Sequence, residues 1–186
     1  MRQTTALLII DMQHCMSKAV IPERNNPEAE AQIQDLLSAW RLANWPVIHI
    51  HHISREANSG FRPSQAGAAF QSEFEPRADE AIFEKNRPDA FCNTGLERWL
   101  HVRGIQGLVI TGVSTNNSVE ATARSAGNLD FTTYVVANAC FTFPKLDYRG
   151  VLRSADEVHA MSLANLADEY AEIITSSDLL KLMAAF

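Results

Sequence analysis

Short apolar runs alternate along the chain with segments whose apolar residues recur at helical spacing. Six runs predict buried strands, at residues 6–10, 46–50, 81–84, 108–113, 131–136 and 172–175. After the first run, the residues that recur at i, i+3, i+4 and i+7 and predict one buried helix face are Ile33, Leu36, Leu37 and Trp40. Buried strands that alternate with helices are typical of a parallel sheet covered on both faces. The pattern therefore predicts a three-layer α/β/α fold around a six-stranded, mostly parallel sheet.

Polar residues at the expected helix starts carry capping signals. Residues 26–28 (Asn-Pro-Glu) have the order of a cap residue, a first-turn proline and a first-turn acid. Residues 94–97 and 154–157 have the spacing of capping boxes, and the polar cluster 114–117 is suited to capping the helix after the fourth strand. Residues 54–76 lack a clear period and predict a long loop, which in a compact domain is usually functional. Beyond the second capping box, the residues expected to be buried are Val158, Met161 and Leu166.

Composition and charge narrow the class of protein. The 186 residues suit one domain spanning 1–186, and 46% hydrophobic with 20% charged residues argues against disorder or low complexity. The net charge of -6, with no cluster of Lys and Arg, argues against a nucleic-acid partner. Apolar runs are all too short to span a membrane, and the first strand begins too early to leave room for a signal peptide. Three widely spaced cysteines favour a reducing compartment, so we expect a cytoplasmic protein.

Three chemically useful side chains follow the ends of predicted strands. Asp11 follows the first strand, Lys85 the third, and Ser118 lies just past the fourth, at the start of a helix. In open parallel sheets, ligands bind beyond the carboxyl ends of the strands. An acid, a cation and a hydroxyl that meet near a helix N-terminus would suit acyl transfer. The alternative is a capping Asp11, a solvated Lys85 and a Ser118 that only lines its helix.

Three motifs resemble those of the isochorismatase-like hydrolases, also called the cysteine hydrolase superfamily. The first motif is Leu8-Ile9-Ile10-Asp11-Met12-Gln13. The second spans residues 83–96 and contains Phe83-Glu84-Lys85-Asn86-Arg87, Ala90-Phe91 and Thr94-Gly95-Leu96. The third spans residues 111–124, from Thr111 to Arg124. The likeness runs in order over almost the whole chain. It implies a Rossmann-like six-stranded parallel sheet, assembly as a homodimer or homotetramer, and hydrolysis of small amides, carbamoyl compounds or the vinyl ether of isochorismate.

The resemblance also assigns roles to residues of this chain. Asp11 matches the general base of the family's catalytic triad, Lys85 its companion cation, and Ser118 stands where the amidases have their nucleophilic cysteine. It further implies a cis peptide between Val113 and Ser114, which would help to aim backbone N–H groups into an oxyanion hole. We expect Ser114, Gln13 and Phe91 to contribute to substrate binding or to that hole.

The serine at position 118 leaves several interpretations open. A cysteine there would be activated as a thiolate by the lysine and the helix N-terminus, whereas a serine hydroxyl must lose its proton to Asp11 during attack. The serine is a native nucleophile, or it replaces a native cysteine, or the reaction needs no nucleophile because Asp11 protonates a vinyl ether. A further alternative is a non-catalytic protein that binds a small molecule.

Other candidate groups carry less weight. Among the three neighbouring histidines, His49 and His51 share one strand face and His52 points to the other, and no aspartate stands two residues before any of them. We therefore expect no metal and no cofactor. Cys15, Cys92 and Cys140 are expected to be small buried apolar residues. We assign structural roles to Glu157 and His159.

Overall fold

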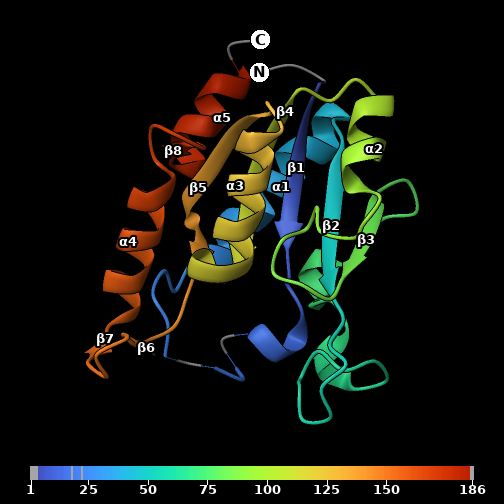
Figure 1. Cartoon of the computed structure of the whole chain (residues 1–186). Helices are drawn as coiled ribbons and strands as arrows, with labels where there is room; N and C mark the ends of the chain where they lie inside the picture. Colours follow the sequence, from blue (N-terminus) through green and yellow to red (C-terminus); the bar gives the residue numbers. More distant parts are fainter. Residues whose placement is uncertain (1–3, 18, 22, 185–186) are drawn as a thin grey trace.

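A six-stranded parallel sheet forms the centre of the computed structural model, which describes residues 4–17, 19–21 and 23–184 (Figure 1). Its strands are β1 (Thr5–Ile10), β2 (Val47–His52), β3 (Ala81–Lys85), β4 (Gly107–Val113), β5 (Thr132–Phe141) and β8 (Glu172–Ile174). The order across the sheet is β3-β2-β1-β4-β5-β8, and each neighbouring pair is parallel. All six predicted strands are confirmed, although β5 extends well past its predicted end. The first three residues and the last two of the predicted domain lie outside the described residues.

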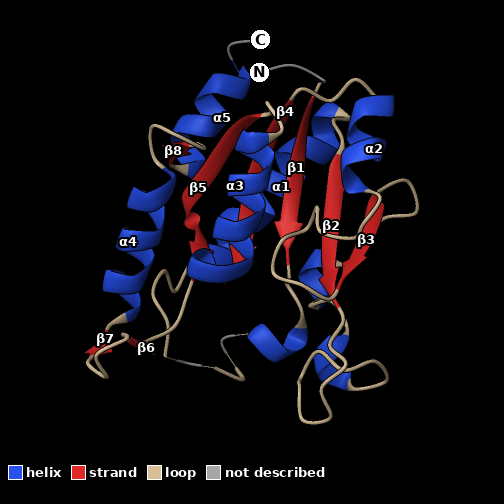
Figure 2. Cartoon of the chain, viewed as in Figure 1, coloured by secondary structure: helices blue, strands red, loops and turns tan. Residues whose placement is uncertain are grey.

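Helices cover both faces of this sheet (Figure 2). Helices α1 (Ala29–Ala43) and α5 (Ser176–Ala184) pack on one face, and α2 (Leu96–Val102), α3 (Glu120–Asn128) and α4 (Ala155–Leu166) pack on the other. The predicted three-layer α/β/α arrangement is therefore confirmed. The predicted helix face from Ile33 to Trp40 is fully buried against the sheet.

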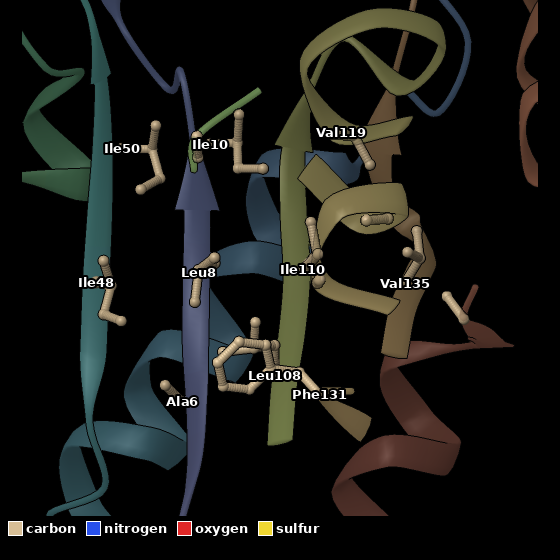
Figure 3. Close-up of a cluster of buried hydrophobic side chains, with 14 of the residues drawn as sticks. Ala6, Leu8, Ile10, Ile48, Ile50, Leu108, Ile110, Val119, Phe131 and Val135 are labelled. Atoms are coloured by element: carbon tan, nitrogen blue, oxygen red, sulfur yellow. The ribbon is translucent and has the colours of Figure 1, made fainter. Parts of the chain in front are cut away.

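The apolar run of β1 supplies both halves of the core. Leu8 and Ile10 face the cluster beneath α2 and α3, where they lie beside the β2 residues Ile48 and Ile50 (Figure 3). The alternate side chains of β1 face α1 in the second cluster. Burying one such side chain contributes about 1.5–3 kcal/mol. A strand buried on both sides needs an unbroken apolar run, which is the pattern that the sequence displays.

Two of the three capping predictions at residues 26–28, 94–97 and 154–157 are wrong. Asn26 adopts a left-handed backbone (φ 45°), and its Nδ2 donates to the carbonyls of Ala137 and Cys140 at 2.9 and 2.6 Å. It therefore ties the start of α1 to β5 and caps no helix. Thr94 donates to Ala90 O at 2.6 Å and accepts from Leu96 N at 3.3 Å, so it meets the first N–H of α2 without forming the predicted capping box with Glu97. Ser154 does cap α4 in a capping box.

Two further helix predictions need correction. Met161 is 65% exposed, so the buried face of α4 runs through Ser162, whose hydroxyl donates to Thr115 O at 2.9 Å. The cluster at 114–117 supplies no side-chain cap, because a turn of π-helix (Thr115–Val119) precedes α3.

The connections after β2 and β5 carry short local structure. Residues 54–76 form the predicted long loop with two short 3-10 turns, Ala66–Ala68 and Ser72–Phe74. After β5, β6 (Lys145–Leu146) and β7 (Leu152–Arg153) form a small antiparallel ribbon that the sequence pattern does not predict. Within the described residues, no helix combines the length and the apolar character that a membrane crossing requires.

Candidate active site

The site lies where the order of strands reverses. From β1 the chain continues through β2 and β3 toward one edge of the sheet, and from β4 it continues through β5 and β8 toward the other. The carboxyl ends of β1 and β4 therefore border the crevice in which open α/β sheets bind ligands. Asp11 directly follows β1, Lys85 ends β3, and Ser118 lies in the turn after β4.

The structure brings these three side chains together around one ammonium group. Lys85 Nζ donates to Asp11 Oδ2 at 2.8 Å and to Ser118 Oγ at 3.1 Å. All three residues are at most 5% exposed. Because isolated charges are costly to bury, the lysine and the aspartate depend on each other in this position. The alternative of a solvated Lys85 and a merely capping Asp11 does not fit these contacts.

A fourth residue, His52, completes the shell of the ammonium. Its Nδ1 lies 3.2 Å from Lys85 Nζ. Burial, and next the charge of Lys85, lower the pKa of His52 below its usual value, so the ring is neutral near pH 7 and accepts a hydrogen bond through Nδ1. Sequence reasoning missed this role. The signal that could have found it is the register of β2 with β3, which pairs His52 with Lys85.

One oxygen of Asp11 stays free. Among the described residues, Asp11 Oδ1 is buried and has no hydrogen-bond partner. A buried carboxylate oxygen without a partner is unusual and calls for an explanation. This oxygen is free to accept a hydrogen bond or a proton from a group that enters the crevice.

Local backbone geometry at the ends of β1 and β4 positions the site. Asp11 turns out of β1 with φ 54°, while its N–H still donates to Ile50 O at 3.0 Å. Gly112 has φ 116°, and a Cβ at this position would lie 2.1 Å from Ile10 O. Only glycine allows β4 to approach β1 so closely. The peptide between Val113 and Ser114 is cis, as the family resemblance implies.

The turn after β4 carries Ser118 toward the lysine. Ser114 O accepts from the backbone N–H groups of Asn117 and Val119, at 3.1 and 3.2 Å. Ser114 itself is half-buried at the head of this turn, next to the crevice. The contribution of Ser114 to an oxyanion hole stays a prediction.

Among the described residues, the side chain of Gln13 bonds only to backbone groups. Its Nε2 donates to His52 O at 3.0 Å and to Ala68 O at 2.7 Å, and its Oε1 accepts from His52 N at 2.9 Å. The fully buried side chain thus connects the segment after Asp11 to β2 and to the long loop. A direct contact between Gln13 and substrate stays a prediction.

Phe91 lies away from the crevice, contrary to the sequence-based expectation. Its ring stacks on Phe131, with 6.0 Å between ring centroids. Phe131 immediately precedes β5, whose first residue pairs with Gly107 at the amino end of β4. Phe91 is therefore half-buried near the amino ends of β4 and β5, at the end of the strands opposite to the crevice.

Two of the three cysteines, Cys15 and Cys140, carry thiols that resist deprotonation. Burial raises the pKa of Cys140 to about 12 and that of half-buried Cys15 to about 11. Both thiols thus stay protonated near neutral pH, whereas a catalytic thiol is deprotonated easily. Cys92 is half-buried, so the expectation of full burial holds for Cys140 alone.

Histidine side chains alternate along β2 as predicted. His49 and His51 both contact Phe70, whereas His52 turns to the other face and contacts Phe61. Within the part of the chain that the structure describes, no group of three or more His, Cys, Asp or Glu side chains is arranged to hold a metal ion.

A large open groove lies apart from the three catalytic candidates. It has a volume of about 920 Å³ and runs between the β6–β7 ribbon and α4. Asn116 and Glu120, which flank Ser118 in the chain, contribute to its wall. Its exposed apolar side chains include Leu146, Tyr148 and Met161.

Comparisons with known proteins agree on one family. The isochorismatase domain matches residues 5–178. The isochorismatase family protein YrdC of Bacillus subtilis is 37% identical over 180 residues, 97% of this chain and 96% of its own. A crystal structure of an isochorismatase-family protein from Chromobacterium violaceum superposes with a TM-score of 0.95 at 48% identity and covers 100% of this chain and 96% of its own. The ureidoacrylate amidohydrolase RutB of Stutzerimonas stutzeri is 27% identical over 170 residues, 73% of this chain and 68% of its own.

Proposed function

This chain belongs to the isochorismatase family of hydrolases, and we propose that it hydrolyses the C–N bond of a small amide or carbamoyl compound. The observation that carries the proposal is the buried Lys85 ammonium, which contacts the carboxylate of Asp11 and the hydroxyl of Ser118. A base, a cation and a hydroxyl in contact are the groups that acyl transfer requires. The amidohydrolase activity named for the relative RutB is of the same class.

In the proposed reaction, Ser118 forms the covalent intermediate. Asp11 Oδ1 removes the hydroxyl proton as Ser118 Oγ attacks the carbonyl carbon, and the carbonyl oxygen becomes an oxyanion. Backbone N–H groups of the turn that begins at Ser114 stabilise that oxyanion. The tetrahedral adduct then breaks its C–N bond, and the leaving nitrogen takes the proton from Asp11. Water next attacks the ester with Asp11 again as base, which releases the acid and restores the hydroxyl.

Lys85 supports two steps of this scheme. Its contact with Asp11 Oδ2 holds the carboxylate in place and leaves Oδ1 free to act as the base. Its contact with Ser118 Oγ stabilises negative charge on that oxygen during attack. A serine is a weaker nucleophile than a cysteine in this setting, and a buried cation partly compensates for that weakness.

Hydrolysis of a vinyl ether is a second candidate, favoured by the same unpaired oxygen. Asp11 Oδ1 could carry a proton to the vinyl carbon, and Lys85 would hold Ser118 Oγ as a binding group without covalent chemistry. The contact of Lys85 Nζ with Ser118 Oγ favours the covalent reaction over this candidate, because only the covalent reaction develops negative charge on the hydroxyl oxygen.

A substrate panel separates the candidates. Purified protein is incubated with small primary amides, carbamoyl compounds and isochorismate, and release of ammonia or pyruvate is followed for wild type, Asp11→Asn and the surface control Asp35→Asn. The proposal expects ammonia release that Asp11→Asn abolishes and Asp35→Asn preserves. Pyruvate release alone would replace it with the vinyl-ether reaction. Saturable binding in calorimetry without any product would indicate a binding protein and contradict both.

A further inference from the structure

We propose that His52 is a positioning residue of this site: its neutral ring holds one N–H of Lys85 and so directs the other two toward Asp11 and Ser118. The catalytic consequence rests on the proposed function. The contact itself is a property of the resting protein, and it can be tested without any substrate.

The number of hydrogen bonds carries the proposal. An ammonium group has three N–H donors and no acceptor. Lys85 Nζ has three partners among the described residues, namely Asp11 Oδ2 at 2.8 Å, Ser118 Oγ at 3.1 Å and His52 Nδ1 at 3.2 Å. With all three N–H groups engaged, the ammonium cannot rotate away from the carboxylate or from the hydroxyl without breaking a buried hydrogen bond.

The contact specifies one protonation state of the ring. Nδ1 can accept from an ammonium only through a lone pair, so the ring proton of His52 must be on Nε2. If the ring gains a second proton, Nδ1 becomes a donor that faces another donor, and two positive charges stand 3.2 Å apart. Protonation of His52 therefore disrupts the arrangement around Lys85.

Groups from each packed element face His52 and set its charge. Lys85 comes from β3, Asp11 from the end of β1, and His51 from the same strand, while Phe61 from the long loop places its ring 4.8 Å away. Burial disfavours a charged ring, and so does Lys85, whereas Asp11 acts in the opposite direction. The net effect lowers the pKa of His52, so the neutral form that the geometry requires is the form present near pH 7.

The backbone of His52 is held as firmly as its ring. Gln13 accepts from His52 N at 2.9 Å and donates to His52 O at 3.0 Å. Gln13 stands two residues after Asp11, so the base and the positioning ring are tied to the same short segment. The hydrogen bonds between the buried Gln13 side chain and the His52 backbone thus set the distance between His52 and Asp11.

The first test is nuclear magnetic resonance of the resting protein with 15N-labelled histidine. We expect the Nε2–H tautomer for His52 at pH 7.5 and a pKa below that of an exposed histidine. Lys85→Met should raise that pKa and allow the other tautomer, because the cation is gone. A ring protonated at pH 7.5, or an Nδ1–H tautomer in the wild type, would overturn the proposal even if Lys85→Met fails to fold.

The second test uses activity against pH on the amide that the panel identifies. His52→Leu removes the acceptor and should lower kcat by up to about 100-fold with a smaller effect on KM, as expected for misplaced catalytic groups. His52→Asn puts Oδ1 where Nδ1 stood, so it should recover most of that loss and move the acidic limb of the profile to lower pH. The matched control His101→Asn, at an exposed position that stacks on Phe131, should behave as wild type.

Two outcomes of the activity measurements would contradict the positioning role of His52. They are His52→Leu with wild-type turnover, and His52→Asn with an unchanged acidic limb. If the wild type cleaves no amide, the proposed function fails, and the magnetic-resonance arm still decides the role of His52.

Discussion

The identity of residue 118 decides which chemistry the site can perform. A cysteine thiol at this position would lose its proton readily, because the charge of Lys85 alone would stabilise the thiolate. A serine hydroxyl is far less acidic, so a base must remove its proton during attack. In the proposed reaction that base is Asp11, whose Oδ1 has no partner among the described residues. The carboxylate of Asp11 thus matters more for attack by a serine than it would for attack by a cysteine.

Gly112 is the residue whose replacement tests the close approach of β4 to β1. Gly112→Ala should lower the free energy of unfolding by at least about 2 kcal/mol, because φ 116° strains alanine and its Cβ would meet Ile10 O at 2.1 Å. The matched control is Gly104→Ala, since Gly104 also has positive φ (65°) but has no neighbour within 4 Å of a Cβ. Urea unfolding of both variants measures the difference. Equal losses in the two would show that the approach at Gly112 is not tight.

Single residues were predictable where a strand end placed them. Asp11, Lys85 and Ser118 each follow a strand that its apolar run reveals, and the family motifs contain all three. Phe91 and His52 were not predictable in this way. Their neighbours are set by how a loop folds back and by the register between two strands, and neither leaves a local pattern.

At the scale of elements, β5 shows how a sequence pattern can end before its strand does. The apolar run breaks at Asn138, yet pairing with β4 resumes at Cys140 after a shift of register that follows the pair Ile110–Val135. Asn138 there bonds to Ser176 in α5, and Asn26 bonds to carbonyls of the same irregular stretch. Ser176 and Asn26, from distant segments, thus supply hydrogen-bond partners for the irregular part of β5. The strand therefore continues where local hydrophobicity does not predict it.

Glu80, which precedes β3, stabilises the edge of the sheet formed by β2 and β3. Burial alone would raise the pKa of Glu80, but hydrogen bonds from Arg41, the Arg77 amide and His49 lower it to about 2. Glu80→Ala leaves Arg41 and His49 without their partner and should cost about 3 kcal/mol in the free energy of unfolding. The control Glu84→Ala removes a carboxylate that is 69% exposed and should cost under about 1 kcal/mol. Matching urea midpoints for the two variants would contradict this account.

For the molecule as a whole, several hydrophobic patterns along the chain together specify the fold. Six apolar runs specify the strands, of which β1, β2, β4 and β5 are largely buried and the edge strands β3 and β8 are partly exposed. The helical stripe from Ile33 to Trp40 specifies a covering layer. The order of the strands then creates the crevice at the ends of β1 and β4. The groove beside α4 was not predictable, because the exposed Met161 fits the same helical period as a buried residue would.

Stability should fall when the medium becomes mildly acidic. Burial lowers the pKa of His49, His52 and His159 in the folded protein below the unfolded value of about 6.5. Between those values the unfolded chain binds more protons, so the free energy of unfolding decreases as the pH falls from about 7 to 5. Urea midpoints at pH 7.5, 6.5 and 5.5 measure the slope. His49→Gln keeps a donor for Glu80 without titrating and should flatten it, whereas a midpoint that rises on acidification would refute the prediction.

Self-association is expected through the groove between the ribbon and α4. Leu146, Tyr148 and Met161 line this groove and are 61–90% exposed, and Leu152, which pairs with Leu146 in the ribbon, is 65% exposed. Exposed apolar patches commonly mark interfaces. Sedimentation velocity should find a homodimer or homotetramer, and Leu152→Glu should shift it toward monomer. The control Leu42→Glu changes an exposed leucine of α1 and should leave the assembly intact. A monomeric wild type at high micromolar concentration would exclude this assembly.

In the proposed mechanism Ser118 is the nucleophile of an amide hydrolase, and a pair of substitutions at position 118 tests this role. On an amide that the wild type cleaves, Ser118→Ala should lower kcat/KM by at least about 1,000-fold, because no covalent intermediate can form. Ser118→Cys should retain or raise turnover, since a thiolate beside Lys85 is the stronger nucleophile. Turnover that survives Ser118→Ala but is lost in Asp11→Asn would contradict the covalent mechanism.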